Sequence, residues 1–167
     1  MSEPFCYIKF EVVSEIKLKR LMKIVSELSK RKQSDDWQDE PHWREFFDRD
    51  ELQYFTVLSE RQWQEWNEFW FTTPIKVRHS SEMPTPGWDF GSMIDAIYHG
   101  DYELINVKVV KDREALLEIL PRGWPYGGLN PLKALVRCFG HKIIGFHTGD
   151  QPFVQGDPQA PTWSPTT

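Results

Sequence analysis

The sequence predicts an α+β fold, with one small mixed or antiparallel sheet of three to five strands and helices mainly on one face. Two observations support this class: some segments have the apolar, β-branched character of buried strands, and others have the caps and apolar stripes of surface helices. The strands are expected at 5–13, 102–110 and 142–147, and the helices at 15–31 and 131–139. This order allows a ferredoxin-like arrangement, in which residues 42–100 form a helical, tryptophan-rich insertion.

Length and composition indicate one domain. The chain has 167 residues, of which 40% are hydrophobic, so it holds enough apolar side chains for a core and is not expected to be disordered. We expect a globular domain over 1–147 and an extended, proline-rich tail over 148–167. Aromatic residues make up 14% and include 8 Trp, which predicts tight packing before it predicts ligand stacking.

Net charge and cysteine content limit which partners and which cellular compartment are expected. The net charge is −5, whereas a protein that binds duplex nucleic acid usually has a basic surface, so double-stranded nucleic acid is not an expected partner. Glu3 stands where a secretion signal carries positive charge, and no stretch approaches the ~20 apolar residues of a membrane span. Cys6 and Cys138 lie in apolar segments without metal-ligand spacing, which favours buried free thiols and a cytoplasmic protein.

The first strand leads into a helix that Ser14 is expected to cap. Apolar residues recur there at helical spacing, namely Ile16 or Leu18, Leu21, Met22, Val25 and Leu28. The opposite face carries the one basic concentration of the chain, within residues 17–32. We interpret it as a solvated helix face, and contact with nucleic acid or an acidic partner is the alternative.

A charged stretch separates the next two apolar segments. Residues 42–47 are expected to form a short helix and residues 52–58 a strand, with Asp48 and Asp50 between them. These carboxylates with His42 suggest a dispersed acid–base site of a hydrolase or transferase. Residues that are close in the sequence need not share a pocket, however. A charged stretch between two apolar segments usually forms a turn.

The second clear helix begins after Ser59, which with Gln62 has the spacing of a capping box. Trp63, Trp66 and Trp70 follow on one helical stripe, and the helix is expected to end before Pro74. This stripe fits either a face packed on the sheet or an exposed aromatic platform for a ligand or partner.

The following elements are read from shorter patterns. Residues 75–78 are expected to form a short strand, and a helix capped by Asp89 or Ser92 should end at Gly100. After the strand at 102–110, we expect Asp112 to cap a helix of about two turns that stops at Pro121.

The last helix and strand have the clearest signals. Asn130 is a good cap, Pro131 suits the first helical position, and Gly140 follows the last helical residue before the strand at 142–147. The loop before this helix contains Trp124, Tyr126, Gly127 and Gly128. It lacks the lysine and hydroxyl residue of a phosphate-binding loop, so its two aromatic rings are expected to cover the core or to form an aromatic rim.

The sequence shows no motif of a catalytic, metal or cofactor site. The leading hypothesis is a non-catalytic binding or protein-interaction module with an aromatic surface. Its candidate residues are Trp63, Trp66, Trp70, Trp124, Tyr126, Gly127 and Gly128. The hydrolase or transferase, and the nucleic-acid contact through the basic helix, remain the alternatives.

Overall fold

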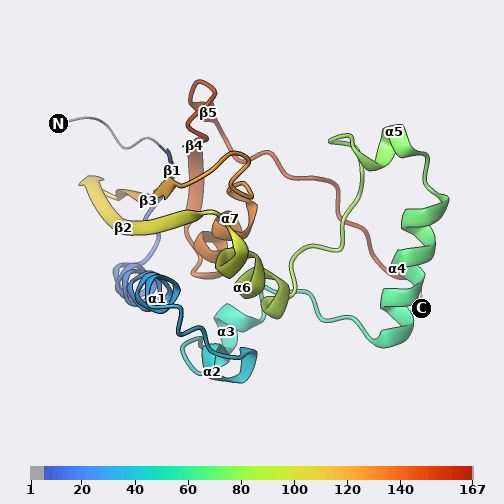
Figure 1. Ribbon diagram of the computed structural model, residues 1–167, viewed down its shortest axis with the longest axis horizontal. Helices are drawn as coiled ribbons and strands as arrows, with labels where there is room; N and C mark the ends of the chain where they lie inside the picture. Colours follow the sequence, from blue (N-terminus) through green and yellow to red (C-terminus); the bar gives the residue numbers. More distant parts are fainter. Residues whose placement is uncertain (1–5, 167) are drawn as a thin grey trace.

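The computed structural model describes residues 6–166 and shows one antiparallel sheet with helices packed against it, which confirms the α+β class (Figure 1). The strands are β1 (Cys6–Glu11), β2 (Tyr102–Lys111), β3 (Glu114–Pro121), β4 (Lys142–His147) and β5 (Val154–Gln155). The helices are α1 (Glu15–Gln33), α2 (Glu40–Arg44), α3 (Arg49–Leu52), α4 (Glu60–Thr72), α5 (Ile75–Arg78), α6 (Phe90–His99) and α7 (Asn130–Cys138). The predicted strand start at Phe5, and Glu3, lie outside the described residues.

The sheet order is β2-β3-β1-β4-β5, and every neighbouring pair is antiparallel. In the chain, α1 connects β1 towards β2, and α7 connects β3 to β4. The first four strands and these two helices therefore have the β-α-β-β-α-β order of a ferredoxin-like sheet. The short β5 extends it beyond β4, and α2 to α6 are inserted between α1 and β2.

The core lies between one face of the sheet and the helices. Cys6, Ile8 and Phe10 of β1 are fully buried and alternate with half-buried residues, as expected when one face of a strand packs and the other meets water. Helix α7 is buried at seven positions because it packs between β4 and α6. Burying each large apolar side chain in this layer contributes about 1.5–3 kcal/mol to folding.

The helix predicted from Asp112 to Pro121 is wrong, because this segment forms β3. Asp112 and Arg113 are the two residues between β2 and β3, and Arg113 has a φ of 58° that suits a tight hairpin turn. β3 then pairs with β1 on one side and β2 on the other. Hydrogen bonds to two neighbours outweigh a local pattern that resembles a short helix.

Two predicted strands are also wrong. Residues 52–58 contain the end of α3 and an irregular segment, and residues 75–78 form the single-turn helix α5 after Pro74. Neither segment lies beside a strand in the described structure, so neither gains the ladder hydrogen bonds that stabilise an apolar run as β structure. The cap of α7 is Leu129 instead of Asn130, which is already the first helical residue.

Helices α4 and α5 stand apart from the sheet and the other helices (Figure 1). The C-terminal segment returns to them, where Thr85 and Thr162 form a β-bridge and Trp163 N donates a 2.8 Å hydrogen bond to Thr85 O. We call residues 57–85 and 160–166 together the arm, and the remaining described residues the body.

Among residues 6–166, no helix combines the length and the apolar character needed to cross a membrane.

Candidate functional site

The arm is built on α4, whose start is well defined. Ser59 Oγ accepts a hydrogen bond from Gln62 N at 3.2 Å, and Gln62 Oε1 accepts one from Ser59 N at 2.9 Å. This capping box, expected from the sequence, satisfies backbone donors at the helix start and is worth about 1 kcal/mol. It stabilises the first turn of α4 through local contacts alone.

An aromatic cluster joins α4 to the end of the chain. The Trp66 ring lies 5.7 Å from Phe69, 6.3 Å from Trp70 and 5.3 Å from Trp163. The guanidinium of Arg78, the last residue of α5, adds to the cluster, since it lies 5.6 Å from the centre of the Trp70 ring. Trp163 thus completes on the arm a cluster that one helix cannot bury alone, and no local sequence pattern signals this contact.

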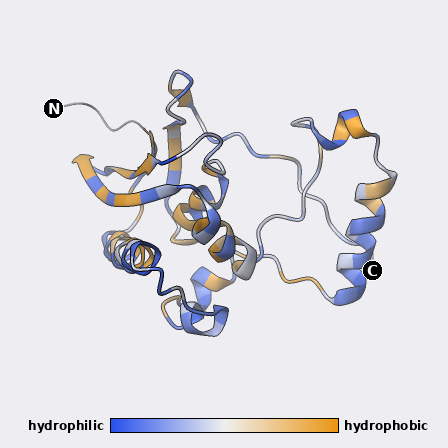
Figure 2. Cartoon of the chain, in the orientation of Figure 1, coloured by the Kyte–Doolittle hydropathy of each residue, from blue (hydrophilic) through white to orange (hydrophobic). Residues whose placement is uncertain are grey.

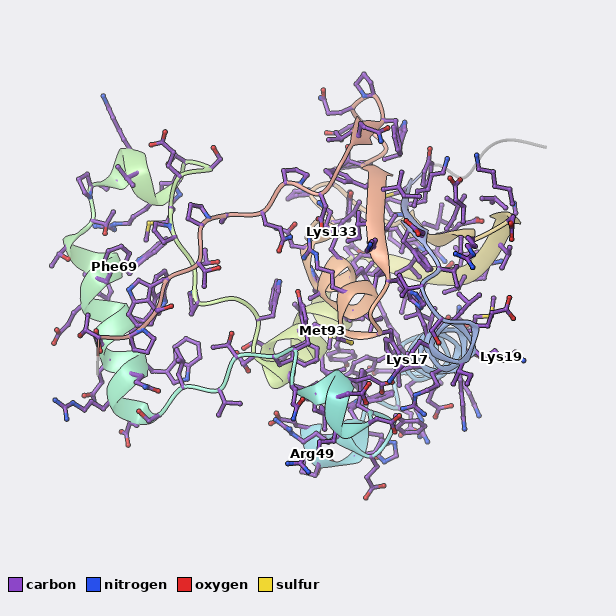
Figure 3. All side chains as sticks on the ribbon, turned by 180° about the vertical axis from the view of Figure 1, so that it is seen from behind. Lys17, Lys19, Arg49, Phe69, Met93 and Lys133 are labelled. Carbon is purple, nitrogen blue, oxygen red and sulfur yellow. The ribbon has the colours of Figure 1, made fainter. Side chains whose placement is uncertain are left out.

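The cluster leaves much of the arm's apolar surface uncovered. None of the residues of α4 is buried, although the helix contains three Trp and two Phe. Around it, Phe71 is 73% exposed, Ile75 66% and Val57 86%. Figure 2 shows hydrophobic residues on α5 and on the adjoining end of α4, and Figure 3 shows Phe69 well separated from Met93 in the body.

Trp63 lies at the junction of the arm with the body. It lines a hollow of about 200 Å³ together with Phe55, Phe90 and Arg44. The three predicted tryptophans of α4 therefore divide: Trp66 and Trp70 belong to the arm's aromatic cluster, and Trp63 faces the body.

The glycine-rich loop places its aromatic rings differently. Trp124 is 54% exposed, whereas Tyr126 is buried and its hydroxyl donates a 3.1 Å hydrogen bond to Thr148 O. Burial raises the pKa of Tyr126 far above its ordinary value. Gly127 and Gly128 are exposed, with φ angles of 102° and 79° that only glycine adopts readily. This loop lies on the body, apart from the arm (Figure 1).

The predicted acid–base residues belong to an ion-pair cluster. Glu51 is fully buried and accepts hydrogen bonds from Lys17 Nζ at 2.6 Å and from Arg20 Nη2 at 2.7 Å. Asp50 lies 2.7 Å from Lys17, and Asp48 lies 3.2 Å from Arg20. Burial alone would raise the pKa of Glu51, but its hydrogen bonds from Arg20 and Lys17 lower it.

This cluster ties α1 to α3. Ligand oxygens of the three carboxylates lie within 4.8 Å of one another, a spacing that a metal ion also uses, but Lys17 and Arg20 already form ion pairs with them. His42 lines the neighbouring hollow with Asp48. Glu45 lines the same hollow, and Asp48 lies 3.2 Å from Arg20.

Two lysines, the half-buried Lys32 and the buried Lys133, were not singled out as site residues from the sequence. Lys32 Nζ donates to Ile97 O at 2.6 Å and to Gly100 O, and it lies 4.1 Å from the centre of the Tyr102 ring. Burial lowers the pKa of Lys32 to about 8. Lys133 Nζ lies 3.3 Å from the centre of the Phe146 ring, and burial lowers its pKa. Lys32 caps the C-terminal carbonyls of α6, a role that depends on a distant element.

These features define an α+β protein with a ferredoxin-like strand order and a projecting aromatic arm. No model of a protein family, no curated protein and no solved structure matches this chain.

Proposed function

We propose that the protein is a non-catalytic protein-interaction module that binds a partner protein through its arm. One observation carries this proposal: α4 contains three Trp and two Phe in 13 residues, and none of them is buried. A helix with that composition normally packs its aromatic face into a core. Here Phe71 is exposed and the other four rings are only half-buried, so a second protein surface is the natural partner of this helix.

The shape and chemistry of the arm favour a protein over a small molecule. Interaction surfaces are enriched in Trp, Phe and Arg, which are the residues gathered around α4 and α5. The hollow that Trp63 lines holds about 200 Å³, whereas sites for drug-sized ligands hold about 300–1,000 Å³. Covering Phe71, Ile75 and Val57 would contribute about 1.5–3 kcal/mol for each side chain.

Site-specific photo-cross-linking tests the proposal. A photoreactive residue replaces Phe71 or Ile75 on the arm, and Lys142 of the body serves as the matched exposed control. In the cells that make the protein, we expect a discrete cross-linked protein at positions 71 and 75 that is absent at 142. Mass spectrometry of the product distinguishes a second copy of the chain from another protein. Equal products at all three positions, or none, would contradict a role for the arm.

We further propose that the protein works in a reducing compartment such as the cytoplasm. Cys6 and Cys138 are both free and buried, which fits thiols that are never oxidised in the working protein.

A further inference from the structure

Strand β2 is the outermost long strand of the sheet. Its only partner among the described strands is β3, so its other edge carries no strand. An edge of this kind presents backbone N–H and C=O groups that can pair with another chain. Ile105, Val109 and Val110 of β2 are 46%, 51% and 42% exposed, an unusual set of apolar residues for an unpaired edge.

A groove runs between this edge and α1. It encloses about 700 Å³ and is lined on the α1 side by Met22, Ser26 and Ser29 and on the β2 side by Ile105, Asn106 and Val107, among others. Ser29 Oγ donates a 2.8 Å hydrogen bond to Leu104 O, so α1 approaches the backbone of β2 closely. Short hydroxyl side chains on the helix leave room for an extended backbone beside the strand.

The register of β2 limits where another strand can pair. Its pairing with β3 shifts between Leu104 and Asn106, and again between Val109 and Lys111. Bulges interrupt the regular geometry that a neighbouring strand needs. The regular part between the two shifts, Asn106–Val109, begins at the groove. A short segment of about four residues therefore fits this edge, whereas an open-ended stack of strands does not.

Positive charge gathers on the α1 side of the groove. Lys30 lines the groove, and Lys19 and Lys23 lie one helical turn before Met22 and Ser26. Lys23 also lines the hollow beside His42. Other cations of α1 are occupied, since Lys17 and Arg20 bind Glu51 and Arg31 binds Glu27. Within residues 6–166, no salt bridge neutralises Lys19, Lys23 or Lys30. Figure 3 shows Lys19 on the opposite side of α1 from Lys17.

We propose that this groove binds an extended acidic segment of a partner protein, which pairs as an added strand with the free edge of β2. Backbone hydrogen bonds to β2 supply affinity, and alternate side chains of the segment meet Ile105 and Val107. Carboxylates on the segment pair with Lys19, Lys23 and Lys30. A second copy of the chain, paired through its own β2, is a poorer occupant, because its α1 carries the same lysines. The site is independent of the arm.

Binding of defined peptides to the full chain tests this site. The probe is a fluorescein-labelled peptide of alternating Glu and Val, and its matched controls are the Lys–Val peptide and a Glu–Val peptide N-methylated at alternate residues. Fluorescence anisotropy should show binding of the unmodified acidic peptide only, because N-methylation removes the donors that pair with the edge. Amide NMR shifts should map to β2 and to the groove side of α1.

Protein variants separate the groove from the arm and from simple charge attraction. Exchanging Lys19, Lys23 and Lys30 together for Gln should weaken binding of the acidic peptide roughly tenfold. Helix α1 should stay folded, because all three side chains are exposed. The arm variant Phe71→Ser should leave the peptide affinity unchanged. Equal binding of the N-methylated peptide, absence of binding, or tighter binding of a single-stranded oligonucleotide at the same residues would each overturn the proposal.

Discussion

At the scale of single residues, the buried Glu51 and the half-buried Lys32 connect distant parts of the chain. Glu51 joins α3 to Lys17 and Arg20 of α1, and Lys32 of α1 caps the end of α6. Glu51 has lost its contact with water and Lys32 has lost part of it, so both depend on their partners for compensation. Their titration should therefore be visible in the stability of the protein.

Glu51→Gln should lower the free energy of unfolding at pH 7 by about 2–3 kcal/mol. The value is below the 3–5 kcal/mol of a fully buried broken pair because Lys17 and Arg20 keep partial contact with water. The folded-state pKa of Glu51 is depressed below 4.5, so its contribution is present above that pH and is lost as the pH falls through the folded pKa.

Urea unfolding at pH 7 and pH 3 measures this difference. The difference in the free energy of unfolding between the variant and the wild type should be smaller at the lower pH. Asp50→Asn, at an exposed carboxylate of the same cluster, should lower the free energy of unfolding by less than Glu51→Gln does. An equal loss at both pH values would contradict the assigned ion pairing.

Lys32→Met should remove a pH dependence of stability on the alkaline side. Burial lowers the folded pKa of Lys32 from 10.5 to about 8, so the unfolded chain binds this proton more tightly. Stability conferred at this site therefore rises as the pH increases from about 8 towards 10.5. Chemical denaturation at pH 8 and pH 10 should show a smaller gain for the variant than for the wild type, with the exposed Lys30→Met as control.

At the scale of elements, α4 differs from the other long helices. Five residues of α1, four of α6 and seven of α7 are buried, whereas α4 has none. Its tertiary support comes mainly from Trp163 at the far end of the chain. The stability of α4 should therefore be local and distinct from that of the sheet.

Trp163→Ala should loosen α4 without unfolding the body. Removing the Trp163 indole takes away its ring contacts with Trp66 and Phe69. Helix α4 then keeps its capping box, the hydrogen bonds from Thr166 to Glu65 and the hollow that Trp63 lines with the body. Hydrogen exchange should become faster in α4 and stay unchanged in β1 and β3. Faster exchange throughout the sheet would show that the arm and the body unfold together.

At the scale of the whole molecule, the chain segment that forms most of the arm begins and ends at neighbouring positions on the body. Thr56 N donates a 2.9 Å hydrogen bond to Trp88 O, and Thr56 Oγ1 donates to Pro86 O. The chain thus leaves the body and returns to it at one place, while the core residues of the sheet, α1, α6 and α7 form one cluster.

Replacing residues 58–84 by a short Gly-Ser linker should therefore leave the body folded. Thr56 and Trp88 are already adjacent, so the linker closes a small loop, and the free energy of unfolding of the body should change by no more than about 1 kcal/mol. Circular dichroism and urea denaturation measure the outcome, and peptide binding at the β2 groove should persist. Loss of cooperative unfolding would mean that the arm is part of the core.

The sequence predicted the elements whose signals are local. The caps at Ser14 and Ser59, the apolar stripe of α1, and the strands β1, β2 and β4 all follow from spacing and side-chain type. They could be predicted because a cap and a helical stripe involve residues only three or four positions apart. The same signals established the α+β class.

Tertiary structure alone decided what depends on distant partners. Residues 114–121 form a strand because β1 and β2 lie on either side, while residues 52–58 have no such neighbours. Tyr126 is buried and no ring of α4 is, whereas the sequence left both a core position and an exposed position open for each of these aromatic groups. Burial, ion pairing and edge exposure arise from contacts between residues far apart in the chain, so local patterns carry no record of them.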